Sequence, residues 1–147
     1  MTIDAIEHQR LEEFPSLLWV QIKTADGIVG LAETLFGARA VESYIHETVA
    51  VLLGKDPLQV DRHSRFLLNA FVGFSGTGVE MRRTSAIDIV LWDIFGQAVG
   101  RPIHQLLGGL SRDKVRIYRL FSFRIFLGWS RIPLKPVHDD AVSLTCI

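Results

Sequence analysis

The sequence contains a single cysteine, Cys146, one residue from the end of the chain. One cysteine cannot form a disulfide bond within the chain, which excludes a disulfide-stapled secreted scaffold. We therefore expect a reducing, cytoplasmic setting. His138, Asp139 and Asp140 also carry nucleophile or ligand chemistry, but the segment around them has no regular pattern, and we predict no catalytic role for this thiol.

The sequence also has no excess of either charge, since 16 basic residues balance 16 acidic residues. A neutral chain lacks the basic face of a nucleic-acid-binding protein and the charge of an electrostatic membrane anchor. No apolar run approaches the roughly 20 residues that cross a bilayer. The start, MTIDAIEHQRLEE, is acidic and alternating rather than a basic stretch before an apolar run, so it does not resemble a signal peptide. We expect a soluble chain with no nucleic-acid or membrane partner.

The first third of the chain favours β-strands. TIDAIEHQRL, SLLWVQIKT and GIVGLAE are three β-rich runs, and Ala25-Asp26-Gly27 separates the second from the third. An Asp-Gly turn between two such runs is a strong hairpin signal. These stretches predict a three-stranded antiparallel sheet.

From Ala38 the apolar residues recur every three or four positions, which is typical of helices. The first predicted helix carries apolar residues as far as Leu52, and Gly54 stands where a left-handed cap ends it. Further helices are predicted over 59–70 and 80–99, followed by a short one after Pro102. Strands followed by helices indicate an α+β fold, with the sheet followed by a helical bundle.

The longest predicted helix is apolar on most of its sides. One arc of about 140° contains most of its apolar residues, namely Ala86, Ile87, Val90, Leu91, Ile94 and Ala98. Ile89, Trp92 and Phe95 lie outside this arc, so we expect the helix to be buried on more than one side. Asp88 and Asp93 are about 140° apart and cannot easily share one metal ion. Each is predicted to pair with an arginine or a backbone group.

No complete catalytic or metal-binding motif is present. HETVA begins like a zinc-protease helix, but Ala50 stands where the second histidine is needed. The glycines of GFSGTGVE precede a helix, yet no Gly-Lys-Ser/Thr follows, and we interpret them as a mobile loop. The sequence therefore predicts no catalytic residue and no metal ligand.

Several stretches together resemble the N-terminal capping domain of the enolase superfamily, in its mandelate racemase and muconate lactonizing enzyme branch. They are VQIKTADGIVGLAE, LLGKDP, TGVEMRRTSAIDIVLWDIFGQAVGRPIHQLLGG and VRIYR. The resemblance covers about residues 1–119, and it implies that the long apolar helix packs where the cap meets the catalytic barrel.

The resemblance also implies a function. Complete members abstract a proton next to a carboxylate and stabilise the enediolate with Mg²⁺, while two mobile loops of the cap contact the substrate. By position, these loops correspond to residues 10–16 and 34–40. Phe14 and Phe36 are expected to exclude water, and Arg39 to pair with a hydroxyl or carboxylate of an acid sugar. The alternative is that these are ordinary loop side chains.

The resemblance implies three segments: a capping domain over 1–113, the first strand of a (β/α)8 barrel over 114–120, and an atypical tail over 121–147. The family's base and its acidic metal ligands stand on later barrel strands, and no residue here matches them. We therefore expect a truncated chain, inactive alone, similar to the cap of an acid-sugar dehydratase or racemase. Two alternatives remain: a module that associates with itself or with a full-length homologue through its exposed apolar helix, and an unrelated small α+β binding protein.

Overall fold

The computed structural model describes residues 1–69 and 78–114. The chain divides into two compact units, Met1–Leu107 and Gly108–Ile147, and every helix and strand described here belongs to the first. The predicted barrel strand after Lys114, the tail over 121–147 and most of the GFSGTG loop lie outside the described residues. No helix within the described ranges is both long and apolar enough to cross a membrane.

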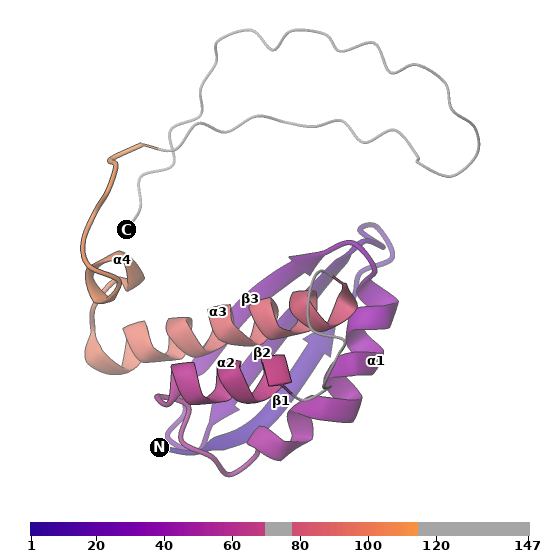
Figure 1. Ribbon diagram of the computed structural model, residues 1–147, viewed down its shortest axis with the longest axis horizontal. Coiled ribbons are helices and arrows are strands. Elements are labelled where there is room, and N and C mark those ends of the chain that lie inside the picture. Colours follow the sequence, from indigo (N-terminus) through magenta and orange to yellow (C-terminus); the bar gives the residue numbers. More distant parts are fainter. Residues whose placement is uncertain (70–77, 115–147) are drawn as a thin grey trace, which may run out of the picture. The chain divides into compact units, whose positions relative to one another are not determined.

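The first unit contains a three-stranded antiparallel sheet in the order β1-β2-β3 (Figure 1). The strands are β1 (Ile3–Gln9), β2 (Leu17–Thr24) and β3 (Val29–Leu35). Gly27 takes a φ of 88° in the β2–β3 turn, and its N–H donates to Thr24 O over 2.9 Å. Glycine adopts this left-handed conformation without the steric penalty of a Cβ. The predicted hairpin and sheet are confirmed.

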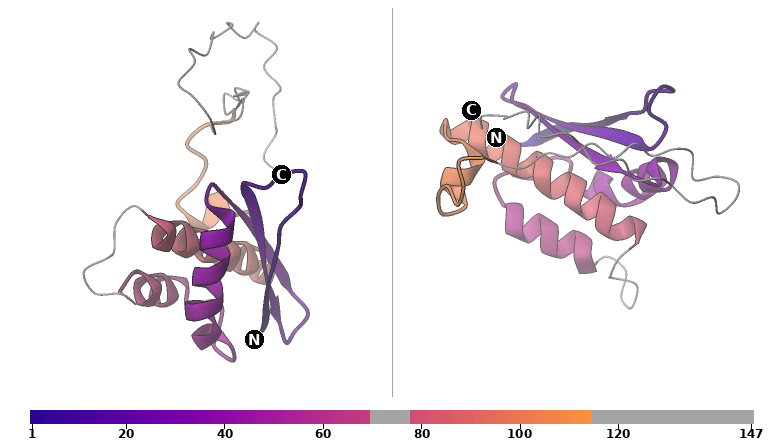
Figure 2. Two further views of the ribbon diagram at one scale, coloured as in Figure 1. Left: turned by 90° about the vertical axis from the view of Figure 1, so that its right-hand side faces the viewer. Right: turned by 90° about the horizontal axis from the view of Figure 1, so that it is seen from above.

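The middle strand has one buried face. Its burial alternates strictly, with Leu18, Val20, Ile22 and Thr24 buried and their neighbours partly exposed. Successive side chains of a strand point to opposite faces of the sheet, so one face alone supplies the core. The helices lie on that face (Figure 2).

Within residues 1–69 and 78–114, five helical elements follow the sheet. They are α1 (Ala38–Thr48), the 3₁₀ turn η1 (Val49–Leu52), α2 (Val60–Asn69), α3 (Val79–Val99) and α4 (Ile103–Leu106). Strands followed by helices on one face make an α+β fold, as predicted.

The first helix ends earlier than the periodicity predicts. α1 ends at Thr48 and the chain tightens into η1, whereas the pattern predicted one helix as far as Leu52. The Thr48 hydroxyl donates to Tyr44 O over 2.5 Å, and a hydroxyl bonded back to the preceding turn bends or weakens a helix. The predicted cap residue Gly54 does take a left-handed φ of 73°.

The long helix α3 packs on β3 at very short range. A Cβ added to Gly30 would lie 2.6 Å from Ile94 Cγ1 and 2.7 Å from Val90 O, so only glycine fits there without a shift. The predicted arc of α3 is buried from Ala86 to Ile94. Ala98 is exposed, contrary to prediction, because the last turn of α3 extends past the rest of the helical layer (Figure 1).

Candidate functional site

The two predicted capping loops lie side by side at one end of the sheet. Phe36 N donates to Ser16 O over 2.9 Å, which joins the loop after β3 to the loop before β2. Leu17 and Leu35, the strand residues next to this bond, are paired across the sheet. The sheet register therefore places Ser16, at the end of the first loop, beside Phe36 in the second. The second loop is shorter than predicted, because β3 runs to Leu35 and α1 begins at Ala38.

Phe36 holds a strained backbone conformation within this loop pair. Its φ of 66° is left-handed, and Gly37, the N-cap of α1, follows with a φ of 68°. A residue with a Cβ pays about 1–2 kcal/mol for this conformation. The Phe36 side chain is nevertheless 54% exposed, so burial of its ring does not offset the strain. Strain held at an exposed aromatic residue is typical of binding loops.

Arg82, on the first turns of α3, contacts both the Phe36 ring and the backbone next to it. Its guanidinium carbon lies 5.5 Å from the centroid of the Phe36 ring, and its Nη1 donates to Leu35 O. A guanidinium over an aromatic ring attracts the ring electrostatically. Arg82 could not be predicted as part of this site, because it stands 47 residues from Leu35 and no local pattern connects the two.

Phe14 and Arg39, the other two predicted site residues, are also exposed. Phe14 is 46% exposed and sits where two turns meet: its N–H donates to Leu11 O over 3.1 Å, and its carbonyl accepts from Leu17 N over 2.9 Å. Arg39 stands in the first turn of α1, and its guanidinium has no hydrogen-bond or ion-pair partner among the described residues. Both residues are therefore open to solvent, where a ligand could meet them.

The loop pair forms an apolar rim next to Arg39. We call Leu11, Phe14, Leu35 and Phe36 the loop rim; each is more than 40% exposed. Scattered exposed apolar residues are ordinary, but several at one edge are typical of binding surfaces. The rim with Arg39 is suited to excluding water and pairing an anion.

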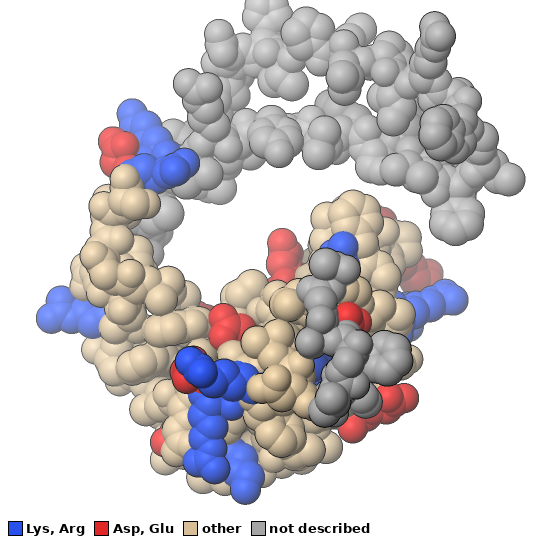
Figure 3. Space-filling model, in the orientation of Figure 1, with Lys and Arg blue, Asp and Glu red and all other residues tan. Residues whose placement is uncertain are grey.

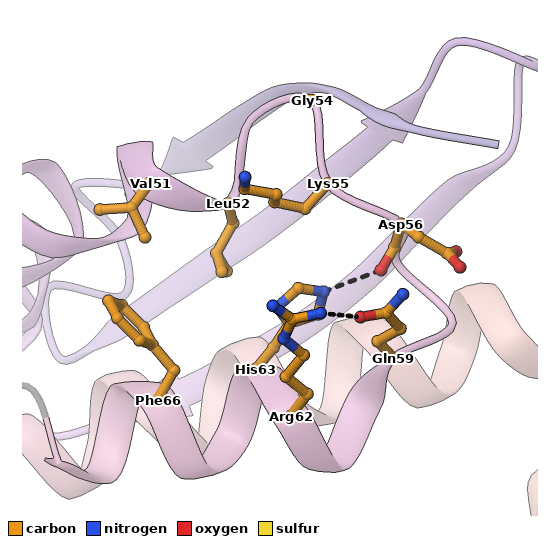
Figure 4. Close-up of a pocket in the computed structure, with 9 residues that line it drawn as sticks. All are labelled: Val51, Leu52, Gly54, Lys55, Asp56, Gln59, Arg62, His63 and Phe66. Carbon is orange, nitrogen blue, oxygen red and sulfur yellow. Dashed lines mark hydrogen bonds between the residues drawn. The ribbon is translucent and has the colours of Figure 1, made fainter.

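A cavity of about 350 Å³ lies elsewhere, between η1 and α2. Val51 and Leu52 face Phe66 and His63 across it (Figure 4). Basic side chains gather over α2 and the turn before it (Figure 3). They include Lys55, Arg62 and Arg65.

This cavity lies away from the loop rim. Lys55 O accepts from Ile3 N over 2.9 Å, so the cavity adjoins the start of β1, whereas the loop rim follows its end. Two of its polar side chains already have partners within it: His63 Nε2 contacts Asp56 O at 2.8 Å, and Arg62 donates to Gln59 Oε1 over 2.9 Å. The cavity therefore contributes nothing to the predicted site.

The two aspartates of α3 hold the fold together. Asp93 Oδ2 accepts from Leu31 N over 2.9 Å, which confirms the predicted backbone partner. Asp88 accepts instead from Ser64 Oγ over 2.5 Å, and the prediction of an arginine or backbone partner was wrong. Ser64 reaches Asp88 because α2 packs alongside α3.

A second polar cluster joins β1 to α1. Glu42 accepts from Arg10 Nε over 2.7 Å, and its other oxygen lies 2.7 Å from His8 Nε2. The His46 ring meets the His8 ring edge-on, with the centroids 4.7 Å apart. We call His8, Arg10, Glu42 and His46 the seam cluster. The sequence offered one signal for this cluster, because Glu42 and His46 stand at positions i and i+4 and so share one helix face, but Glu42 was not predicted.

Comparison with known families identifies the described fold. The family profile described as "Mandelate racemase / muconate lactonizing enzyme, N-terminal domain" matches residues 11–108. The match covers all of β2, β3 and the helices and leaves out β1.

Curated relatives include two D-galactonate dehydratases. The one from Pectobacterium atrosepticum is 40% identical over 121 residues, and the one from Xanthomonas axonopodis pv. citri is 39% identical over 108 residues. The matches cover 80% and 71% of this chain but only 31% and 28% of the relatives. The chain thus spans about a third of the length of these enzymes.

Solved structures agree. An enolase of the mandelate racemase subgroup from Agrobacterium tumefaciens is 49% identical with a TM-score of 0.74, over 79% of this chain and 32% of that one. A putative galactarate dehydratase from Agrobacterium radiobacter, bound to Na and L-malate, is 27% identical with a TM-score of 0.73. That match covers 80% of this chain and 30% of the other.

Proposed function

Since the chain belongs to the mandelate racemase and muconate lactonizing enzyme family of the enolase superfamily through its N-terminal capping domain, we propose that this domain contacts the acid-sugar substrate of a dehydratase. The observation that carries the proposal is the loop rim. Two loops that are distant in sequence meet through the hydrogen bond from Phe36 N to Ser16 O, and both present exposed aromatic rings.

Each loop residue has a distinct role in this proposal. Phe14 and Phe36 exclude water from the substrate, since a dry site strengthens every electrostatic interaction inside it. Arg39 pairs with the carboxylate or a hydroxyl of the sugar acid, because a guanidinium binds a carboxylate with two parallel hydrogen bonds. Arg82 positions Phe36 from α3 and does not itself touch substrate.

An acid sugar is the substrate class that the relatives favour. Both named curated relatives are D-galactonate dehydratases, and one structural relative is a putative galactarate dehydratase. Among the possible reactions we infer dehydration rather than racemisation or cycloisomerisation. Loops that contact the distal part of a substrate do not by themselves decide the reaction, so this step rests on the relatives alone.

The Mg²⁺ that enolase superfamily members use does not fit the described residues. The cluster found there with three possible ion ligands is His8, Glu42 and His46, and two of its three groups are imidazoles. Mg²⁺ prefers an octahedron of oxygen ligands. We therefore derive no step through Mg²⁺ and propose that these residues bind and enclose substrate without supplying the chemistry.

A second candidate function is an interaction module. Ile89 is 48% exposed in the middle of α3, a helix that is otherwise largely buried. An exposed apolar side chain in such a helix favours association with a second copy or with a full-length homologue. Association requires another molecule to cover Ile89, whereas contact between the loop rim and substrate does not.

Titration of the isotope-labelled chain with D-galactonate, followed by NMR, tests the capping function. We expect weak binding with a Kd of about 1–10 mM, and amide shifts confined to residues 10–16 and 34–40. Arg39→Ala removes the proposed carboxylate partner and should weaken binding at least about fivefold without unfolding the domain. Arg62→Ala, on α2, is the matched control and should leave binding unchanged.

Amide shifts confined to residues around the cavity beside α2 would contradict binding at the loop rim. The absence of any shift at D-galactonate concentrations up to about 50 times the expected Kd would contradict it as well. The same sample, incubated with Mg²⁺ and a panel of sugar acids, should produce no dehydration. Turnover would contradict a role restricted to capping.

A further inference from the structure

The seam cluster brings two imidazoles and one carboxylate together across two elements, and we propose that His8, Glu42 and His46 bind a divalent transition-metal ion of the Zn²⁺ class. The cluster belongs to neither the loop rim nor the cavity beside α2. Its test is therefore independent of the capping function.

The ligand atoms already lie close to the spacing that a metal requires. Nitrogen or oxygen atoms of the three side chains all fall within 4.8 Å of one another. Zn²⁺ binds such atoms at about 2.0–2.2 Å, so a tetrahedral site separates neighbouring ligand atoms by about 3.3 Å. His8 Nε2 and Glu42 Oε1, now 2.7 Å apart, would separate slightly, while His46 would move inward.

The cluster is open enough for this adjustment. The side chains of His8 and Glu42 are 21% and 23% exposed, and His46 is exposed. The two imidazoles meet at 90° with centroids 4.7 Å apart, so the edge of one ring faces the other ring. Binding of one ion by both nitrogens therefore requires the exposed His46 ring to rotate, and the ion has a direct path from solvent.

The donor chemistry selects the class of ion. Two imidazole nitrogens and one carboxylate oxygen suit Zn²⁺, Ni²⁺ or Cu²⁺, whereas Mg²⁺ and Ca²⁺ prefer oxygen atoms alone. Three protein ligands leave a fourth position for water, as in zinc sites that keep an open position.

Arg10 supports this arrangement from behind the carboxylate. Its Nε donates to Glu42 Oε2 over 2.7 Å and so leaves Oε1 turned toward the imidazole of His8. Carboxylates that bind metals are commonly held by such a hydrogen bond. The competing interpretation is that Glu42 only forms ion pairs with His8 and Arg10, and it predicts no affinity for metal. Partly exposed ion pairs contribute little to stability, so stability alone does not account for four polar groups at this seam.

The primary test is calorimetric titration of the purified 147-residue chain with Zn²⁺. We expect one high-affinity ion per chain. Zn²⁺ at 100 times its Kd should raise Tm on the order of 10 °C, because the ion binds the folded state across β1 and α1. His46→Gln should lower the Zn²⁺ affinity about 100-fold or more, since second-sphere changes alone cost 10–100-fold. Because His46 is exposed, we expect this substitution to destabilise the domain less than a substitution of His8 or Glu42. His104→Gln, on α4, is the matched control.

Two further outcomes would overturn the proposal. One is the absence of Zn²⁺ binding. The other is affinity that survives His46→Gln but disappears in the double variant His138→Gln, Cys146→Ser, which would assign the ion to the C-terminal segment. Glu42→Gln gives an internal check, because it should weaken Zn²⁺ binding while circular dichroism stays unchanged.

Discussion

Arg83 brings a positive charge into the interior of the helical layer, where only 1% of the residue is exposed. Its Nη1 donates to Thr48 Oγ1 over 2.7 Å and its Nη2 to Leu67 O over 2.7 Å. These bonds tie α3 to the end of α1 and to α2. Buried charges are tolerated when hydrogen bonds replace the lost water, and Arg83 meets most of that requirement with neutral oxygens.

The charge of Arg83 has a cost as well as a structural role. Burial lowers the pKa of its guanidinium, and the nearby Tyr44 and Glu80 partly oppose this shift. A cationic group whose pKa falls on folding opposes folding at every pH below that lowered pKa. The hydrogen bonds must therefore offset a desolvation cost throughout the physiological range.

Arg83→Ala should lower the free energy of unfolding by about 3–5 kcal/mol, because it leaves a cavity and strands the Leu67 carbonyl and the Thr48 hydroxyl without their donor. Arg83→Met is the matched variant. It keeps the stem and removes the desolvation cost, so it should lose less than half as much. Urea unfolding measures both. A loss below about 1 kcal/mol for Arg83→Ala would mean that the buried bonds contribute no net stability.

At the scale of elements, α3 protects the free edge of β3. β3 lies at the end of the strand order and pairs only with β2, so half of its backbone groups face away from the sheet. Polar side chains of α3 satisfy three of them, through the pairs Asp93 with Leu31 N, Gln97 with Val29 O, and Arg82 with Leu35 O. Unpaired strand edges favour aggregation, and covering them with a helix is a common protection.

Asp93→Ala should open this edge. The Leu31 amide loses its acceptor, so its hydrogen exchange should accelerate about tenfold and the domain should lose about 1 kcal/mol of stability. Asp88→Ala is the control, since it removes a carboxylate from the same helix without touching β3. Hydrogen exchange followed by NMR separates the two. Equal exchange rates of the Leu31 amide in both variants would show that Asp93 does not protect this amide better than water does.

At the scale of the whole chain, the surface of α3 bears on the choice between capping and association. The sequence placed both Ile89 and Trp92 outside the buried arc. Of these two side chains, Ile89 is the exposed one. Trp92 is half-buried against the core, and its ring stacks on Phe95 with centroids 5.7 Å apart. An apolar contact with another molecule would therefore centre on Ile89.

Ile89→Lys should reduce self-association of the chain, measured by sedimentation over a range of concentrations, and leave its stability within about 0.5 kcal/mol. Trp92→Lys is the contrasting variant and should lower the free energy of unfolding by about 2–3 kcal/mol, because it removes a partly buried ring. If the unmodified chain is monomeric and Ile89→Lys changes nothing, the interaction module loses its support.

Much of the fold could be predicted because the relevant signals are local. The Asp-Gly turn and the three β-rich runs identified the sheet, and apolar spacing located the helices to within a few residues. The one misjudged boundary, at Thr48, depends on a hydroxyl that bonds both backward along α1 and across to Arg83. Phe14 and Phe36 are exposed in loops and Arg39 on the first turn of α1, and their role toward substrate stays a prediction.

The sequence by itself determined the order of the elements, the apolar face of the long helix and the family. These properties depend on periods of 2 and 3.6 residues and on turn residues, which operate within one element. The tertiary structure alone decided that Arg82 supports Phe36, that Asp93 covers β3 and that His8 meets Glu42, pairs separated by 34 to 62 residues. Such contacts depend on how a helix crosses a sheet, and packing angles leave no repeating mark along the chain.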